Sequence, residues 1–152
     1  MHGLISLLAK SIRFLGFRFT RRLSVVVEDC TPIVGANGMT IEALGIGTVA
    51  GEFIPVIEAG TTVPCSFAEN FTTAIDGQDK IMVSLYRGTE ERVENNHSLG
   101  IFQVVGIPDV ARETPLIEII FTVTDQQILL SAHELDSNAE MEIEAMHESG
   151  EK

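Results

Sequence analysis

The segment Gly45-Ile46-Gly47-Thr48-Val49-Ala50 has the G-x-G-x-x-G/A spacing of dinucleotide-binding loops. In such loops a helix must begin directly after the glycines, so that its N-terminus faces the pyrophosphate. Here Gly51, Glu52 and Pro55 follow within a β-type pattern, and no strand–helix–strand unit surrounds the segment. We therefore interpret these glycines as positions in a strand and loop where another backbone approaches closely.

The other residues with chemical potential do not form a recognisable centre. The two thiols, Cys30 and Cys65, lie 35 residues apart and form no C-x-x-C pair. No histidine stands at a metal-ligand spacing from another; the four are His2, His97, His133 and His147. A zinc site would need such clusters, and a hydrolase of the common types would need a G-x-S-x-G elbow. The sequence therefore predicts no catalytic residues, no metal ligands and no enzyme, with reduced thiols in an intracellular protein.

Charge divides the 152 residues into two unequal parts. Residues 1–23 carry five basic residues and no acid, whereas the rest of the chain carries all 22 Asp and Glu against five Lys and Arg, a net charge of −17. A body this acidic repels phosphate backbones, so we expect no nucleic acid as a partner. It should instead attract cationic partners.

Residues 1–24 form a basic, hydrophobic leader. Arg-rich, acid-free composition is typical of a mitochondrial transit peptide, and the alternative is a disordered leader on a cytoplasmic protein. No apolar run reaches the roughly 18 residues of a membrane-spanning helix, so integral membrane association is not expected.

From Val25 onward short apolar or alternating runs recur between turn residues, which is a β pattern. The clearest runs are Phe53–Ile57, Phe67–Thr73, Ile81–Tyr86, Ile101–Val105, Leu116–Val123 and Ile128–Ser131. They predict an all-β, antiparallel two-sheet sandwich of about eight strands over residues 41–140. Residues 25–40 are linker-like, and residues 141–152 form a short acidic tail, with one more strand expected near Met141–Ile143.

Several blocks in order resemble the substrate-binding domain of the seventy-kilodalton heat-shock chaperone family. They are Leu44-Gly45-Ile46-Gly47-Thr48-Val49-Ala50-Gly51 (usually L-G-I-E-T-x-G-G), Gly60-Thr61-Thr62-Val63-Pro64 (N-T-T-I-P), Phe71-Thr72-Thr73-Ala74-Ile75-Asp76-Gly77-Gln78, Asn95-Asn96-His97-Ser98-Leu99-Gly100-Ile101-Phe102, Gly106-Ile107-Pro108, Pro115-Leu116-Ile117-Glu118-Ile119-Ile120-Phe121 and Ile128-Leu129-Leu130-Ser131-Ala132. The resemblance covers about residues 41–138.

The resemblance implies chaperone-type binding of extended hydrophobic peptides from unfolded proteins. The peptide-contact positions carried over are Ile46, Thr48, Val49, Phe71, Ala74, Gln78, Ile81, Val83 and Ile117. In the family, the residues matching Val49 and Ala74 form an arch over the peptide, and those matching Ile81 and Val83 line the central pocket. The acidic body favours peptides with basic flanks, and other chaperones are further expected partners.

The chain departs from the family pattern in several places. From the extent of the resemblance we expect this chain to lack the family's ATPase domain and helical lid, and therefore to use no ATP or other cofactor. Asp76 and Arg112 match lid-contacting positions and are left with nothing to latch. About nine extra residues from Ile33 to Ile41 follow the linker-like segment, one residue is missing near Leu130, and Gly47 replaces Glu, which adds backbone freedom.

Two hypotheses therefore stay open. One is a lone peptide-binding module without nucleotide control, and the other is a degenerate β-sandwich that has lost peptide binding and serves as an interaction or structural module.

Overall fold

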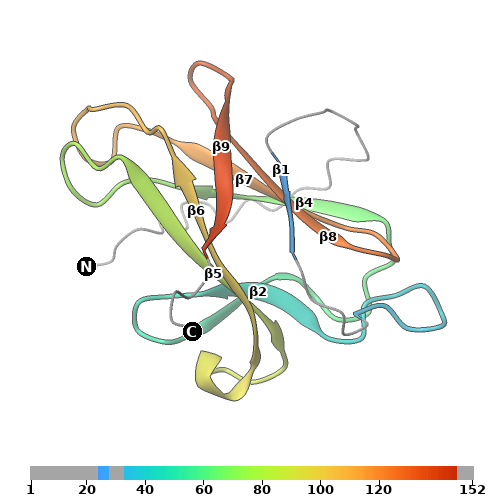
Figure 1. Ribbon diagram of the computed structural model, residues 1–152. Helices are drawn as coiled ribbons and strands as arrows, with labels where there is room; N and C mark the ends of the chain where they lie inside the picture. The colour runs from blue at the N-terminus through green and yellow to red at the C-terminus, as the bar shows by residue number, and fades with distance from the viewer. Residues whose placement is uncertain (1–23, 28–32, 147–152) are drawn as a thin grey trace.

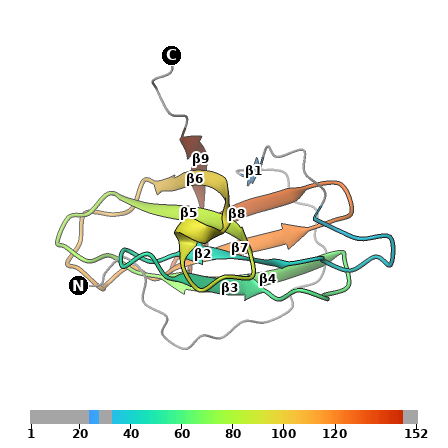
Figure 2. The ribbon, with the colours of Figure 1, turned by 90° about the horizontal axis from the view of Figure 1, so that it is seen from below.

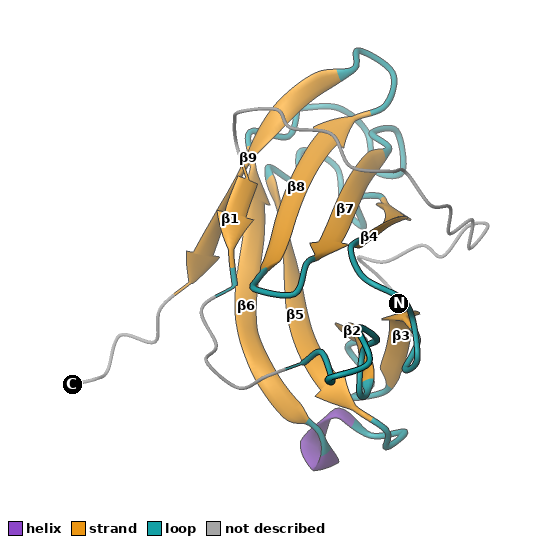
Figure 3. Cartoon of the chain, turned by 90° about the vertical axis from the view of Figure 1, so that its right-hand side faces the viewer, coloured by secondary structure: helices purple, strands orange, loops and turns teal. Residues whose placement is uncertain are grey.

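The computed structural model describes residues 24–27 and 33–146, which form an all-β molecule (Figure 1). The strands are β1 (Ser24–Val26), β2 (Ala43–Gly47), β3 (Phe53–Ile57), β4 (Cys65–Phe71), β5 (Lys80–Gly88), β6 (His97–Val105), β7 (Ile117–Val123), β8 (Ile128–Glu134) and β9 (Ala139–Met146). The single helical element in this part of the chain is the short 3-10 turn η1 (Val93–Asn95), drawn purple in Figure 3. The predicted all-β class is confirmed.

All strand pairs are antiparallel and belong to one sheet, in the order β3-β2-β5-β6-β9-β8-β7-β4, with β1 beside β8. The sheet curves until it is nearly closed into a barrel, and its two end strands, β3 and β4, do not pair with each other. The sequence predicted two separate sheets. Instead the two halves are continuous, because β9 pairs with β8 through Ala139–Met141 and then with β6 through 142–146.

β9 lies in a stretch that its composition suggested was mostly an acidic tail. Its acids alternate with apolar residues: Met141 and Ile143 are buried, whereas Glu140, Glu142 and Glu144 are exposed. This period of two is that of a half-buried strand. The sheet therefore extends beyond residue 140, and the strand expected near Met141–Ile143 is present.

β1 extends the sheet at the other end of the sequence. It pairs with Leu129–Ser131 of β8, next to the stretch of β8 that pairs with β9. The Val27 amide donates a hydrogen bond to the Ile128 carbonyl (2.9 Å), and the Val27 side chain is buried in the core. The first part of the linker-like segment is thus part of the barrel wall.

The core fills the inside of this barrel with aliphatic and aromatic side chains. The alternation in Leu116–Val123 predicts one apolar face, and this is confirmed, because Ile117, Ile119, Phe121 and Val123 are all 0% exposed. Burial of each such side chain stabilises the fold by about 1.5–3 kcal/mol.

The part of the chain that the structure describes contains no helix with the length and apolar character of a membrane span.

The extra residues 33–41 form a small hairpin. Val34 pairs with Thr40, and the Ile41 amide donates to the Ile33 carbonyl (2.9 Å). The hairpin packs on the connection between β3 and β4, where Met39 pairs with Thr62. In Figures 1 and 2 this hairpin projects at the right, beyond the end of β2 where the strand begins.

Candidate functional site

The predicted peptide-contact residues gather where several strands turn at one end of the barrel. Ile46 lies near the end of β2 and Phe71 ends β4, whereas Ile81 lies near the start of β5 and Ile117 begins β7. Adjacent strands of an antiparallel sheet run in opposite directions, so the end of one strand lies beside the start of its neighbour. The β2–β3 turn (48–52) and the β4–β5 loop (72–79) both lie at the left in Figures 1 and 2.

The nine positions fall into two groups by exposure. We call Ile46, Phe71, Ile81, Val83 and Ile117 the floor, because each is at most 2% exposed and belongs to the same core cluster. We call the other four positions the rim, since they lie in the turn and the loop: Thr48, Val49, Ala74 and Gln78. Val49 is the most accessible, with 78% of its surface exposed.

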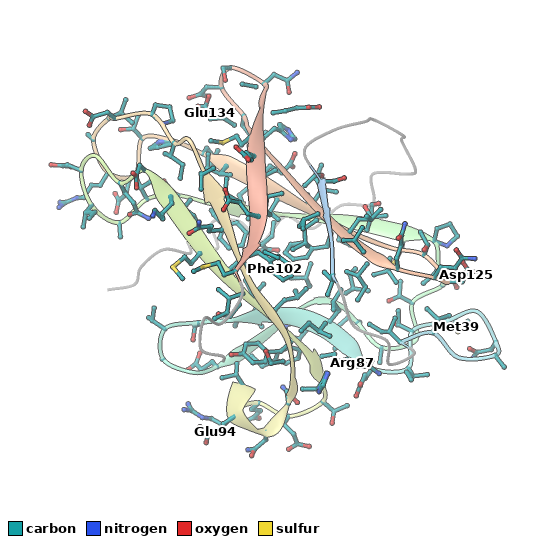
Figure 4. All side chains as sticks on the ribbon, viewed as in Figure 1. Met39, Arg87, Glu94, Phe102, Asp125 and Glu134 are labelled. Atoms are coloured by element: carbon teal, nitrogen blue, oxygen red, sulfur yellow. The ribbon has the colours of Figure 1, made fainter. Side chains whose placement is uncertain are left out.

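Cross-strand pairing brings the floor residues together. Phe71 lies directly opposite Ile117 on β4 and β7, and Val83 lies opposite Phe102 on β5 and β6. Phe102 lies near the centre of the barrel in Figure 4. The floor residues therefore lie on the inner surface of both halves of the sheet, and they pack as core in this structure.

The β2–β3 turn is closed by its own hydrogen bonds. The Thr48 carbonyl accepts from the Gly51 amide (2.9 Å), the Glu52 carbonyl accepts from the Thr48 amide (2.9 Å), and the Thr48 hydroxyl accepts from the Glu52 amide (3.1 Å). Gly51 has φ of 86°, a left-handed conformation that favours glycine. This closed turn projects Val49 into solvent.

The β5–β6 loop (89–96) supports the turn from below. Arg92 Nη1 donates to the Ala50 carbonyl (3.2 Å), and the Val93 amide donates to the Gly51 carbonyl (3.0 Å). The sequence analysis did not single out Arg92. No spacing signal links it to the turn, because its partners lie about forty residues away in the sequence.

Gln78 organises the β4–β5 loop. Its Oε1 accepts from the amides of Ala74 (2.8 Å) and Ile75 (3.3 Å), and its Nε2 donates to the Lys80 carbonyl (2.8 Å). The side-chain amide is thus engaged within its own loop. Gln78 therefore shapes the surface that carries Ala74. Direct contact between the Gln78 side chain and a peptide stays a prediction.

The β6–β7 loop (106–116) braces the β4–β5 loop from the other side. Asp76 Oδ1 accepts from the Arg112 amide (2.9 Å), and the Thr72 hydroxyl donates to the Pro115 carbonyl (2.6 Å). The sequence analysis left Asp76 and Arg112 with nothing to latch. In the structure they contact each other, and the carboxylate of Asp76 holds the two loops together.

Gly47, where the sequence analysis expected added backbone freedom, is the last residue of β2 and is paired with Phe53. A Cβ at this position would lie 2.9 Å from Tyr86 Cε1 and 3.0 Å from Val93 Cγ1. The Tyr86 ring therefore occupies the space that a side chain at residue 47 would use.

Other chemical candidates are structural. The residues after Gly47 form a turn, not a helix, so the dinucleotide-type fingerprint lacks its phosphate-binding geometry. Burial raises the pKa of the Cys65 thiol above its ordinary value of 9.0, which favours the unreactive protonated form. Within the described residues no group of three His, Cys, Asp or Glu could hold a metal ion.

A cavity of about 270 Å³ lies elsewhere, between the end of β6 and the β8–β9 turn. Its lining includes Val105, Pro108, Glu134, Ser137 and Met141 but none of the nine predicted positions. Glu134 is labelled at the top of Figure 4. Its lining also includes three carboxylates, Glu134, Glu140 and Glu142, which suit an apolar peptide side chain less well, so the rim and floor are the better candidate.

A protein-family model with the description Hsp70 protein matches residues 26–152 of this chain. The match therefore includes every floor and rim residue and all of the described structure except Ser24 and Val25.

Proposed function

Since this chain belongs to the Hsp70 chaperone family, we propose that it binds extended hydrophobic segments of unfolded proteins. The bound segment lies between the two loops that carry the rim residues and above the floor. The all-strand architecture is consistent with the family's substrate-binding domain. The observation that carries the proposal is that the nine positions lie at one end of the barrel, with exposed Val49 and half-buried Thr48, Ala74 and Gln78 in two braced loops and buried apolar residues beneath them. In this proposal binding uses no nucleotide.

Two kinds of contact would supply affinity. Backbone groups of an extended peptide pair with strand edges regardless of sequence, which gives breadth. An apolar side chain that reaches the floor contributes roughly 1.5–3 kcal/mol, which gives selectivity for hydrophobic segments. Because the floor is fully buried in this structure, the rim must part before a peptide side chain reaches it.

A second candidate is an interaction or structural module without peptide binding. It is favoured by the burial of the floor, since residues at 0–2% exposure pack as ordinary core. Two departures that motivated it are accommodated, however. The hairpin at 33–41 lies away from the rim, and β8 pairs with β7 without a register break despite the missing residue near Leu130.

The test is fluorescence anisotropy of a labelled Leu-rich heptapeptide with Lys flanks, titrated with the wild-type chain and with Val49→Ser. We expect saturable binding that Val49→Ser weakens about 10-fold or more, because an exposed apolar contact worth at least ~1.4 kcal/mol is lost without a change in charge. Ile41→Ser is the matched control: it makes the same aliphatic-to-serine change at a residue that is 54% exposed but lies in the hairpin.

The control should bind within about two-fold of wild type. Absence of saturable binding by a folded wild-type chain would reject the proposal and support the second candidate. Equal weakening by both variants would place any binding outside the rim.

A further inference from the structure

We infer that the segment Phe14-Leu15-Gly16-Phe17, between Arg13 and Arg18, is a ligand for the peptide site of its own chain. This inference rests on the proposed function. It assigns the leader a second role as an internal competitor that an unfolded client must displace.

The leader has the chemistry that the proposed site selects. Four apolar or small residues stand between two arginines, and residues 1–23 contain no acid. The segment lies outside the described residues, so its placement is argued from its sequence and from the surface that would receive it.

The receiving surface is complementary in charge. The β2–β3 turn and the β4–β5 loop carry Glu52, Asp76 and Asp79, all exposed, and neither segment contains Lys or Arg. Arg92, which contacts the turn from the β5–β6 loop, is itself paired with Glu94 (3.9 Å). An arginine at each end of a short apolar segment can therefore face acidic side chains of the two rim loops. Attraction between such charges acts over a Debye length of about 8–10 Å at moderate salt.

The receiving surface also offers a strand edge. Among the described residues, β3 pairs only with β2, and β4 pairs only with β7. β4 is the better partner for an added strand, because Pro55 of β3 has no N–H and the Phe53 amide already donates to the Glu91 carbonyl (2.9 Å). An extended segment beside β4 would lie next to Phe71 and the start of the β4–β5 loop.

The tether is long enough to reach across much of the domain. Arg18 precedes Ser24 of β1 by six residues, which span up to roughly 20 Å when extended. A compact domain of this length has a radius of gyration of about 15 Å. A short tether gives an effective concentration on the order of millimolar, so even weak intrinsic affinity fills the site.

The experiment compares full-length chains, so that the fold is not altered by truncation. The anisotropy titration of the Lys-flanked heptapeptide is repeated with the double variant Phe14→Asp/Phe17→Asp. The matched control, Leu4→Asp/Leu8→Asp, makes the same charge change in the same leader outside the proposed segment. We expect the first variant to bind at least about 10-fold more tightly than wild type and the control to match wild type.

A synthetic Arg-Phe-Leu-Gly-Phe-Arg peptide should compete for the site freed in the Phe14→Asp/Phe17→Asp chain. Equal affinity of that chain, the control and wild type, with binding intact in all three, would overturn the self-ligand and leave the proposed function standing. Binding by none of them would instead reject the proposed function. If wild type alone doubles in mass with rising concentration, the leader binds a second copy, and the internal arrangement is rejected.

Discussion

Gly45 and Gly47 are two residues apart in β2, yet different neighbours require glycine at each. A Cβ at Gly45 would lie 2.1 Å from the Ile54 carbonyl oxygen and 2.7 Å from Pro55 Cα, where β2 and β3 shift register. At Gly47 the nearest atoms belong to the side chains of Tyr86 and Val93. Backbone atoms of a paired strand cannot move aside, whereas side chains can repack.

This difference predicts distinct costs for two alanine substitutions. Gly47→Ala should lower the free energy of unfolding by about 1–3 kcal/mol, and Tyr86→Ala in the same chain should relieve part of that loss. Gly45→Ala should cost more and should not be relieved by Tyr86→Ala. Urea unfolding of the single and double variants measures both. Equal relief of the two glycine variants would show that the Tyr86 ring does not fill the space at residue 47.

At the scale of elements, each rim segment is held by a neighbouring loop distant in sequence. The β5–β6 loop holds the β2–β3 turn, and the β6–β7 loop holds the β4–β5 loop. Loops fixed in this way lose less conformational entropy when a ligand binds. The braces would therefore serve the proposed binding as well as stability.

Removing the Arg92 side chain should loosen the β2–β3 turn with little effect on global stability. In Arg92→Ala we expect faster hydrogen exchange of the Gly51 and Glu52 amides and faster dissociation of bound peptide, while the unfolding free energy falls by about 0.5–1.5 kcal/mol. Arg112→Ala is the control, because its hydrogen bond to Asp76 comes from the backbone amide and is retained. Unchanged exchange in Arg92→Ala would mean that the turn holds its shape alone.

The strand β1 gives a second test at this scale. Val27 is 4% exposed and packs in the core, whereas Val26 is 43% exposed. Val27→Asp should destabilise the fold by several kcal/mol, because it buries a charge without a partner, and Val26→Asp should change stability by about 0.5 kcal/mol or less. Urea unfolding midpoints compare the two. Similar small effects would show that β1 is not part of the barrel wall in solution.

At the scale of the whole molecule, charge should tune the choice of peptide. The acidic residues of the β2–β3 turn and the β4–β5 loop, Glu52, Asp76 and Asp79, should favour Lys-flanked over Asp-flanked peptides. Raising the ionic strength from about 0.1 M to about 1 M shortens the Debye length from roughly 10 Å to 3 Å, so this preference should largely disappear.

Anisotropy titrations with the two peptides at both salt concentrations measure the preference. The double variant Glu52→Gln/Asp79→Asn should reduce the preference for the Lys-flanked peptide at low salt. Asp125, labelled at the right of Figure 4, is exposed elsewhere, and Asp125→Asn should leave the preference unchanged. A preference that survives high salt would have to come from contacts other than surface charge.

The sequence by itself determined the β class, the family and most strands. Its signals were local: alternation with a period of two, turn residues between runs, and motif blocks in a fixed order. Phe53–Ile57 is β3 as predicted, and the apolar face of Leu116–Val123 is buried as predicted. Strand alternation reports burial directly, which is why these features could be read without a structure.

Only the tertiary structure decided how the halves join and what shapes the rim. β9 joins both halves because its two stretches pair with different strands, and composition cannot show which partner a strand takes. Arg92 meets Ala50, and Asp76 meets Arg112, only after the barrel brings distant loops together. The same reason explains Gly47, since the Tyr86 ring that requires it lies on another strand. Local patterns fix elements, whereas contacts between residues far apart in the chain exist only in the folded molecule.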